Sequence, residues 1–580
     1  MNKIRLFSLV GAAALLLAAC GQAAPTVAPT AAPKPTEAPP APKPTDAPKP
    51  TAAAKPTEAP KPTAAPAFTG QKVESTDCKA GEVKSIEATD AMTVKFTLCV
   101  PDPALPQKLT GSSFGILQKD DLKATGGVAA KISEKPVGTG PFKVTEWKRG
   151  DSVTMAANPT WWGTPPRIKT LVIRWSKEPA QALLELKSGN ADAITKVATE
   201  DFETVKKDAK LKLVALEPLN IMYVGINNTK APFDNEKVRQ AFAMAIDRKK
   251  IVDEYYPAGS IVAENFVPPS FKPGFSANVK GWEYKPDEAK KMLTEAGFDF
   301  NKEYPLSYRE VSRVYLGAPG KVGQEVQAQL KKIGVKIKLD PKESGTFLKS
   351  VTAGGETMFL LGWGADYPDA TNFYDTHFGD KKDFGKPWDD IIAQIKAGGQ
   401  TADNAKRQAA YDKLNELVKQ HVPVIPVAHG FSGEAFQANV DGAHANPLVP
   451  NEYSVMKGAK DTFVSVQAAE PISLDCADET DGETFNVCGQ IFESLLSFEP
   501  GTVKLKGVLA TEWKANDAAT EWTFKLRPNV KFHNGAVLDA NDVVATFARQ
   551  WDAANPYHKG DSGEFSYWGD YFGGFLNAKK

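Results

Sequence analysis

Residues 321–339 read KVGQEVQAQLKKIGVKIKL, and this stretch decides the fold class. Its first part, Lys321–Ile333, spaces apolar residues at helical intervals and stops at Gly334, a residue type that readily ends helices. The following Val335–Leu339 alternates apolar side chains with lysines, which is typical of a strand with one buried face. A helix followed directly by a strand predicts an α/β fold.

The same punctuation appears on both sides of this stretch. Asp234 is placed to cap a helix whose apolar residues recur at helical spacing, and Pro286–Ala296 begins with proline and stops before Gly297. Near the far end, 522–527 alternates as a strand, 530–532 follows a Pro-Asn turn as a returning strand, and Asp539 opens a helix. The α/β pattern therefore extends to the end of the chain.

Composition narrows the function classes. The chain has 580 residues with 70 Lys+Arg and 70 Asp+Glu, so its formal net charge is zero, which argues against a nucleic-acid-binding protein. With 42% hydrophobic residues and 11 tryptophans, the chain can build large cores, and its length predicts two or more domains. Five cysteines and six histidines, with no close ligand spacing, predict no metal site and no cofactor.

The first 67 residues read as an export leader and a tether. Lys3 and Arg5 precede an apolar stretch that ends at Leu17-Ala18-Ala19-Cys20, which predicts a signal peptide over 1–20. The ending resembles a lipobox, so Cys20 is the predicted lipid anchor; the alternative is an ordinary secretory signal with an incidental cysteine. Residues 21–67 are rich in Ala, Pro, Thr and Lys, which predicts a disordered tether carrying the protein at the outer side of the cell membrane.

The four remaining cysteines form two close pairs. Val83–Glu87 and Met92–Leu98 read as the strands of a hairpin that brings Cys78 opposite Cys99. Cys476 and Cys488 flank a short polar stretch, which a disulfide would close as a loop. An even count in an exported protein predicts two disulfides, and free buried thiols are the alternative.

Many short segments of the body match one known pattern. They are VGTGPF at 137–142, WKRG at 147–150, NPTWW at 158–162, LKSGNAD at 186–192, NNTKAPFD at 227–234, GWGADYPD at 362–369 and VPVIP at 422–426. Together they resemble the family 5 extracellular solute-binding proteins, which include oligopeptide- and dipeptide-binding receptors of ABC importers. The resemblance implies a monomeric receptor that passes a peptide to the importer's permease subunits.

The order of the segments departs from the family. EPISLD at 470–475, IFESLL at 491–496 and LATEW at 509–513 resemble the family's mature N-terminus, yet here they follow its C-terminal segments. Placing 459–580 before 68–458 restores the usual order, so we interpret the chain as circularly permuted. Permutation is tolerated when the original ends lie close together and the new cut is exposed; an artefact of gene assembly is the rival interpretation.

The resemblance implies a two-lobed, type II periplasmic-binding-protein-like fold of the large peptide-binding class. On the family pattern, lobe I takes 68–236, 433–458 and 459–580, and lobe II takes 237–432. The lobes would close over a ligand in the cleft between them.

The same resemblance supplies the candidate site residues. Asp366 would pair with the α-ammonium of a peptide, although Asp-Tyr-Pro-Asp is also good turn chemistry and Asp369 could cap the next helix. Gly362 and Gly364 would offer backbone groups to an extended peptide, and Trp363 would form a pocket wall or simply belong to the core. Asn220 and Val487 would face the cleft from lobe I, with 486–488 as a second strand-like contact.

Catalysis finds no support in the residue patterns. The six histidines have no metal spacing, and neither a nucleophile elbow nor a P-loop is present. The chain is therefore predicted not to be an enzyme. Two alternatives to peptide uptake stay open: an oligosaccharide receptor of the same family, whose tryptophans stack on sugars, and a surface scaffold that keeps only the fold.

Overall fold

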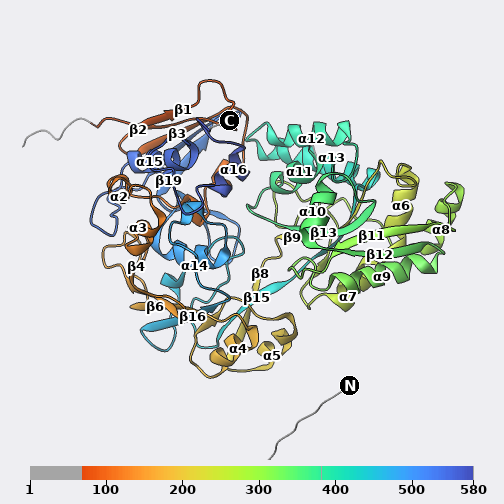
Figure 1. Cartoon of the computed structure of the whole chain (residues 1–580), viewed down its shortest axis with the longest axis horizontal. Helices are drawn as coiled ribbons and strands as arrows, with labels where there is room; N and C mark the ends of the chain where they lie inside the picture. Colours follow the sequence, from red (N-terminus) through yellow and green to blue (C-terminus); the bar gives the residue numbers. More distant parts are fainter. Residues whose placement is uncertain (1–67, 380–381, 579–580) are drawn as a thin grey trace, which may run out of the picture. The chain divides into compact units, whose positions relative to one another are not determined.

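The computed structural model describes residues 68–379 and 382–578, which form one compact unit. This unit contains a five-stranded, a seven-stranded and a six-stranded sheet and a two-stranded ladder of β17 (Leu496–Phe498) and β18 (Leu505–Gly507). We name the part built on the five- and seven-stranded sheets lobe I, and the part built on the six-stranded sheet lobe II. In Figure 1 the orange and blue ends of the chain share lobe I, whereas lobe II is mainly green.

The five-stranded sheet joins the two ends of the body. Its order is β1-β2-β3-β20-β19, with bounds Lys72–Glu74, Val83–Asp90, Thr93–Leu98, Glu521–Leu526 and Ala510–Ala515. β3 pairs antiparallel with β20 so that Phe96 lies opposite Trp522. The Phe96 ring also contacts Phe547 of α15 (Ala540–Trp551) edge-on at 5.3 Å, so residues far apart in sequence share one core.

The seven-stranded sheet has the order β4-β5-β6-β16-β7-β15-β8. The bounds are Phe142–Lys148, Ser152–Ala157, Thr170–Trp175, Thr462–Gln467, Ala193–Ile194, Ser432–Gln437 and Leu211–Leu216. β16 runs parallel to both neighbours, β6 and β7. The helices of lobe I are α1 (Leu105–Lys108), α2 (Lys119–Thr125), α3 (Ala129–Glu134), α4 (Pro179–Lys187), α5 (Phe202–Lys207), α14 (Gly482–Ile491), α15 and α16 (Ser566–Phe572).

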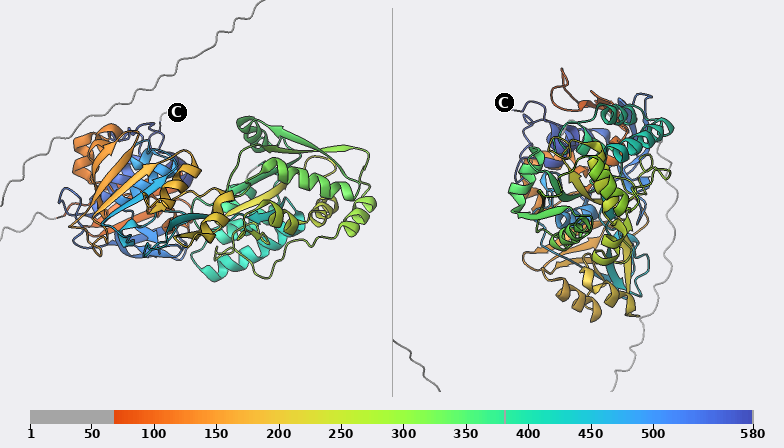
Figure 2. Two further views of the ribbon diagram at one scale, coloured as in Figure 1. Left: turned by 90° about the horizontal axis from the view of Figure 1, so that it is seen from below. Right: turned by 90° about the vertical axis from the view of Figure 1, so that its right-hand side faces the viewer.

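The six-stranded sheet has the order β10-β14-β9-β13-β11-β12. The bounds are Ile261–Val262, Val424–His429, Asn220–Ile226, Met358–Gly364, Glu303–Arg309 and Lys336–Lys342. Its helices are α6 (Glu236–Ala245), α7 (Arg248–Tyr255), α8 (Pro286–Glu295), α9 (Pro319–Lys332), α10 (Ser344–Thr352), α11 (Thr371–Phe378), α12 (Asp389–Gly399) and α13 (Asn404–His421). Figure 2 shows this lobe from two further sides.

The chain passes between the lobes at 217–219 and at 430–431. β8 ends at Leu216 in the seven-stranded sheet and β9 begins at Asn220 in the six-stranded sheet, while β14 ends at His429 and β15 begins at Ser432. The first passage thus comes before the expected boundary between 236 and 237, because β9 already belongs to lobe II.

The helices and strands discussed above are present in the structure, except that one helix cap and one strand differ from the prediction. The helix and strand of 321–339 appear as α9 and β12, with Gly334 between them at φ +90°. The cap of α6 is Asn235, whose side chain accepts from the Lys237 N–H, and not Asp234. The returning strand expected at 530–532 is only an isolated bridge between Lys531 and Val537, because β20 already pairs with β19 and β3.

Both predicted disulfides are present in the structure. Cys78–Cys99 has a Cα–Cα separation of 5.8 Å, and Cys476–Cys488 one of 6.1 Å. The second bridge connects the 3₁₀ turn Cys476–Asp478 with α14. The predicted leader, Cys20 and tether lie outside the described residues.

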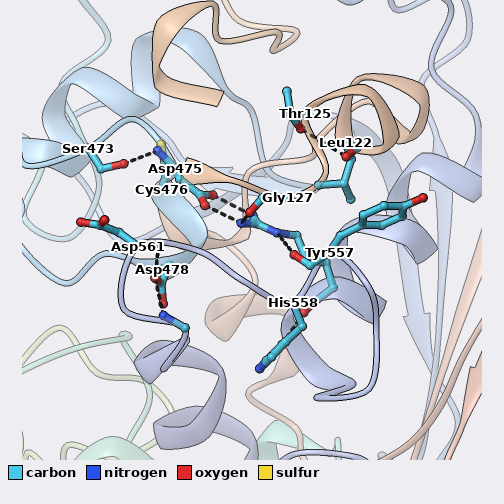
Figure 3. A network of polar contacts seen from close by, with 12 residues as sticks. Leu122, Thr125, Gly127, Ser473, Asp475, Cys476, Asp478, Tyr557, His558 and Asp561 are labelled. Carbon is cyan, nitrogen blue, oxygen red and sulfur yellow. Dashed lines mark hydrogen bonds and ion pairs between the residues drawn. The ribbon is translucent and has the colours of Figure 1, made fainter. Parts of the chain in front are cut away.

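A buried polar network joins α15 to the segment before α14 and to Gly127 (Figure 3). The Arg549 guanidinium and the Asp475 carboxylate form a two-pronged ion pair with both side chains almost fully buried. Arg549 also donates to the carbonyls of Tyr557 (2.9 Å) and Gly127 (3.3 Å). The Asp478 carboxylate accepts backbone N–H groups from the 561–565 loop, so every charge in the network has partners.

Replacing Arg549 by methionine should destabilise the fold strongly. The change leaves the Asp475 carboxylate buried without its cation, at an expected loss of about 3–5 kcal/mol in the free energy of unfolding. Urea unfolding followed by tryptophan fluorescence measures this loss. Lys504→Met is the control, because the Lys504–Glu499 pair is exposed and should be worth about 1 kcal/mol or less; equal losses in the two variants would contradict the role given to Arg549.

Candidate functional site

Two adjoining cavities lie between residues of lobe I and lobe II. The main chamber has a volume of about 900 Å³, with Asp366, Trp363 and Asp375 on lobe II and Lys108 and Tyr571 on lobe I. The second chamber has about 350 Å³ and shares Asp366, Thr480 and Tyr567 with the main chamber. Another cavity of about 270 Å³, beside Trp161 and Trp162, lies within lobe I alone. A ligand held by both lobes therefore has the two shared chambers as its site.

Asp366 lies on the wall of both chambers and is held by Asn372. The Asn372 side chain donates to Asp366 Oδ2 at 3.1 Å and accepts the Asp366 N–H at 3.0 Å. From the other lobe, the Tyr571 hydroxyl donates to the Asp366 carbonyl at 3.1 Å. Surrounding protein raises the pKa of the Asp366 carboxyl above its usual value; the Asn372 hydrogen bond lowers it and nearby Asp570 raises it. A cation entering the chamber would favour the ionised form.

Asp369 has a different role from Asp366. Its Oδ1 accepts from the N–H and hydroxyl of Thr371, each at 3.0 Å, at the start of α11. The same oxygen lies 2.7 Å from the Arg407 guanidinium, and both side chains are 2% exposed. The turn chemistry of the motif is thus supplied by Asp369, which leaves Asp366 available to the cavity.

The edge of β13 that faces away from β9 has no partner strand at Gly362 and Gly364 in the described residues. The Ala365 N–H donates to the Leu219 carbonyl at 2.8 Å, and hydrogen-bonded pairs alternate in an antiparallel ladder, so the backbone groups of Gly362 and Gly364 point away from β9. No strand of the described part pairs with that edge at these two glycines, because β11 joins β13 only at Ser307–Phe359.

Gly362 lies where a larger side chain would not fit, and Trp363 lies on the cavity wall. A Cβ on Gly362 would lie 2.3 Å from the Ile221 carbonyl oxygen and from the Tyr315 ring, whereas Gly364 has open space around it. Trp363 is half-buried, lines the main chamber and donates its indole N–H to Asn372 Oδ1 at 3.1 Å. Trp363 is therefore both a cavity wall and part of the support for Asp366.

Two predicted cleft residues lie elsewhere. Val487 is completely buried in the core of lobe I, and residues 486–488 belong to α14 rather than to a strand-like contact, so the prediction that Val487 faces the cleft is wrong. Asn220 begins β9 of lobe II. Its side chain donates to the Gly430 carbonyl at 2.8 Å and accepts the Gly430 N–H at 2.7 Å, which ties the two inter-lobe passages together.

Several cavity residues had no signal in the sequence analysis. The Lys108 ammonium lies 2.9 Å from Asp102 and 3.3 Å from Glu82. Asp375 faces this group from lobe II; burial and the nearby Asp369 raise the pKa of Asp375 to about 8, although Lys108 lowers it. Glu434 of β15 lines the second chamber. These residues converge from distant segments, so only the fold brings them together.

The described part of the chain contains neither a metal-binding group of side chains nor a membrane-spanning helix. Within residues 68–379 and 382–578, no group of three or more His, Cys, Asp or Glu side chains could hold a metal ion. Over the same residues, no helix is long and apolar enough to cross a bilayer.

His429 is a buried histidine that contacts Asn220 next to the inter-lobe passages. Its ring is fully buried, with Nδ1 at hydrogen-bonding distance from the Asn220 carbonyl, which can only accept. Nε2 has no hydrogen-bond partner in the described residues. Burial lowers the pKa of His429 to about 4, because a second proton would place an unpaired charge in the protein interior.

Stability should therefore fall as the pH drops from about 6.5 towards 4. The folded state favours neutral His429, whereas the unfolded chain takes up a proton near pH 6.5. His429→Asn keeps a donor for the Asn220 carbonyl and should show a smaller decline over this window. Thermal melts of both proteins across this pH window measure the difference in stability. The pKa values of His444 and His533 are also lowered by burial, but both proteins contain these residues, so their contributions cancel in the comparison. Parallel declines would refute the assignment.

Known proteins share both sequence and fold with this chain. The profile of the bacterial extracellular solute-binding proteins, family 5 (middle region), matches residues 29–385 and 504–568. The dipeptide-binding protein of Escherichia coli (strain K12) is 28% identical over 377 residues, covering 63% of this chain and 70% of that protein.

Two solved structures are also similar. HbpA2 from Haemophilus parasuis has a TM-score of 0.62 at 28% identity, covering 65% of this chain and 76% of that one. The dipeptide-binding protein from Pseudoalteromonas sp. SM9913, in complex with Met-Leu, has a TM-score of 0.51 at 25% identity with the same coverage.

Proposed function

The chain belongs to the bacterial extracellular solute-binding proteins of family 5, and from that premise we propose that it captures peptides between its two lobes and delivers them to an ABC importer. Relatives with this fold include dipeptide-binding proteins. The observation that carries the proposal is Asp366, a carboxylate fixed by Asn372 and open to both chambers.

Asp366 suits the amino terminus of a peptide. A carboxylate on a cavity wall accepts a charge-assisted hydrogen bond from an ammonium group, and enclosure by the closing lobes strengthens that bond. The unpaired edge at Gly362 and Gly364 lies two to four residues away on the same segment. Its N–H and C=O groups would bind the peptide backbone by strand addition, which does not depend on side-chain identity.

We also propose that Cys20 carries a lipid anchor and that 21–67 tethers the receptor outside the cell membrane. The leader pattern supports the anchor, and one acylated residue holds a soluble domain without a spanning helix. The protein would act as a monomer, because the two lobes of one chain together line the main chamber.

Replacing Asp366 by asparagine should weaken peptides with a free amino terminus about tenfold or more, because a charged hydrogen bond becomes neutral. Calorimetric titration with a dipeptide and its N-acetylated form makes the comparison. The acetylated form lacks the ammonium, so its affinity should change much less. Equal weakening of both ligands would remove amine recognition from Asp366, and binding of oligosaccharides in place of peptides would overturn the function.

Circular permutation is the arrangement we propose for the gene. The Glu82 N–H donates to the Phe572 carbonyl at 2.7 Å, so the segments next to the two new ends are in contact. β16, which starts the displaced segment, occupies the middle of the seven-stranded sheet. The 377 residues aligned with the E. coli relative amount to little less than 68–458, as expected when an alignment in chain order takes in only one of two exchanged segments.

A reordered chain tests the permutation. The reordered chain consists of residues 459–578, a short glycine-serine linker and residues 68–458. It should fold with an unfolding midpoint within a few degrees of the chain in its own, natural order, because the contacts are the same. Circular dichroism melts and peptide titration provide the comparison. A control chain cut inside β14, between 426 and 427, should not fold. Failure of the first chain under conditions where the natural order folds would count against permutation.

A further inference from the structure

Glu434 is a buried carboxyl group on the wall of the second chamber. It lies on β15, three residues beyond the inter-lobe passage at 430–431, and only 7% of the residue is exposed. Oε2 accepts from the Asn451 side chain at 2.5 Å. Asn451 is the one side chain that donates to Glu434 among the described residues, and Glu434 is part of the chamber lining.

Acidic groups dominate this chamber. Asp366, Glu434 and Glu483 lie on its wall, and among the described residues that line it none is lysine, arginine or histidine. Asn446, Asn451, Gln467 and Asn486 add amide groups, while Phe485 and Tyr567 meet edge-on at 5.4 Å. Carboxylates beside aromatic rings form an environment that favours an organic cation.

Burial favours the protonated form of Glu434 while the chamber holds no cation. Burial raises the pKa of Glu434 to about 8, and the Asn451 hydrogen bond only partly offsets this. The nearby Tyr453 shares a hydrogen bond with the Ser465 hydroxyl at 2.8 Å, and burial raises its pKa so that it is uncharged at neutral pH. The other titratable groups that line the chamber are Asp366, Glu483 and Tyr567; burial and the nearby Asp366 raise the pKa of the Tyr567 hydroxyl to about 12, so it is neutral at pH 7. A cation that enters would find an acid ready to ionise beside it.

We propose that the second chamber is a subsite for a cationic side chain, with Glu434 as the specificity-determining residue. This inference rests on the proposed function: Asp366 takes the amino terminus, and the ammonium or guanidinium of a lysine or arginine in the first two peptide positions enters the adjoining chamber. Glu434 then gives up its proton to solvent and pairs with the cation, so that charge balances within the site. The protein accordingly prefers basic peptides.

Matched ligands test the subsite. Lysine and norleucine share the same aliphatic chain, but only lysine carries the ammonium, so Ala-Lys should bind about tenfold tighter than Ala-norleucine at pH 7. Lys-Ala and norleucine-Ala form the second pair, and at least one pair should show the difference. Calorimetry in two buffers of different ionisation enthalpy should detect one more proton released per lysine peptide bound than per norleucine peptide bound at pH 7, and this difference should disappear at pH 9; the α-amino groups of the two peptides titrate alike and cancel.

Two variants assign the effect to one residue. Glu434→Gln keeps the shape and a hydrogen bond to Asn451 and should reduce the lysine-to-norleucine affinity ratio to about one. Glu452→Gln is the control, because Glu452 lies on the same loop as Asn451 and pairs with Lys506 outside the second chamber; it should retain the ratio. Thermal melts verify that both variants are folded.

The outcomes separate the two proposals. Norleucine peptides binding as tightly as lysine peptides in both pairs would overturn the subsite while leaving peptide capture intact. A preference for Ala-Glu over Ala-Gln would also overturn it, since Glu434 would then act as a neutral donor to an anion. Binding of none of these peptides would overturn the proposed function and the subsite with it.

Discussion

The hydrogen-bonded pair of Asn220 and Gly430 is the constraint on which the arrangement of the cleft depends. The chain passes between the lobes at 217–219 and 430–431, and the Asn220 amide binds both backbone groups of Gly430. His429 adds a contact to the Asn220 carbonyl. Both passages are therefore joined at one short region, and the two sheets that it connects lie wholly on either side of it.

The walls of the cleft follow from that constraint. β13 pairs with β9 directly after the first passage, which places Trp363 and Asp366 beside the chambers. β15 begins directly after the second passage and places Glu434 on the opposite wall. The site thus lies next to the region where the chain passes between the lobes, and its charged contacts are strengthened wherever protein replaces water around them.

Lobe I shows how one core can be assembled from distant parts of a chain. β3 and β20 share a ladder, and the buried Arg549–Asp475 pair links α15 to the segment before α14. The lobe I wall of the main chamber comes from both parts, with Lys108 from one and Tyr571 from the other. A charge-neutral chain can therefore carry a cleft lined by more carboxyl groups than lysines, because folding brings together charges that are mixed along the sequence.

The sequence by itself determined the α/β class, the helix and strand of 321–339, both disulfide pairs and Asp366 as the candidate amine-binding residue. These features depend on local spacing, turn chemistry and short motifs, which neighbouring residues encode. Only the tertiary structure decided that Val487 is core, that Asn220 serves the inter-lobe passage and that Glu434 reaches the cleft. Burial and charge proximity in the cleft arise from segments hundreds of residues apart, and no local pattern records which of them will meet.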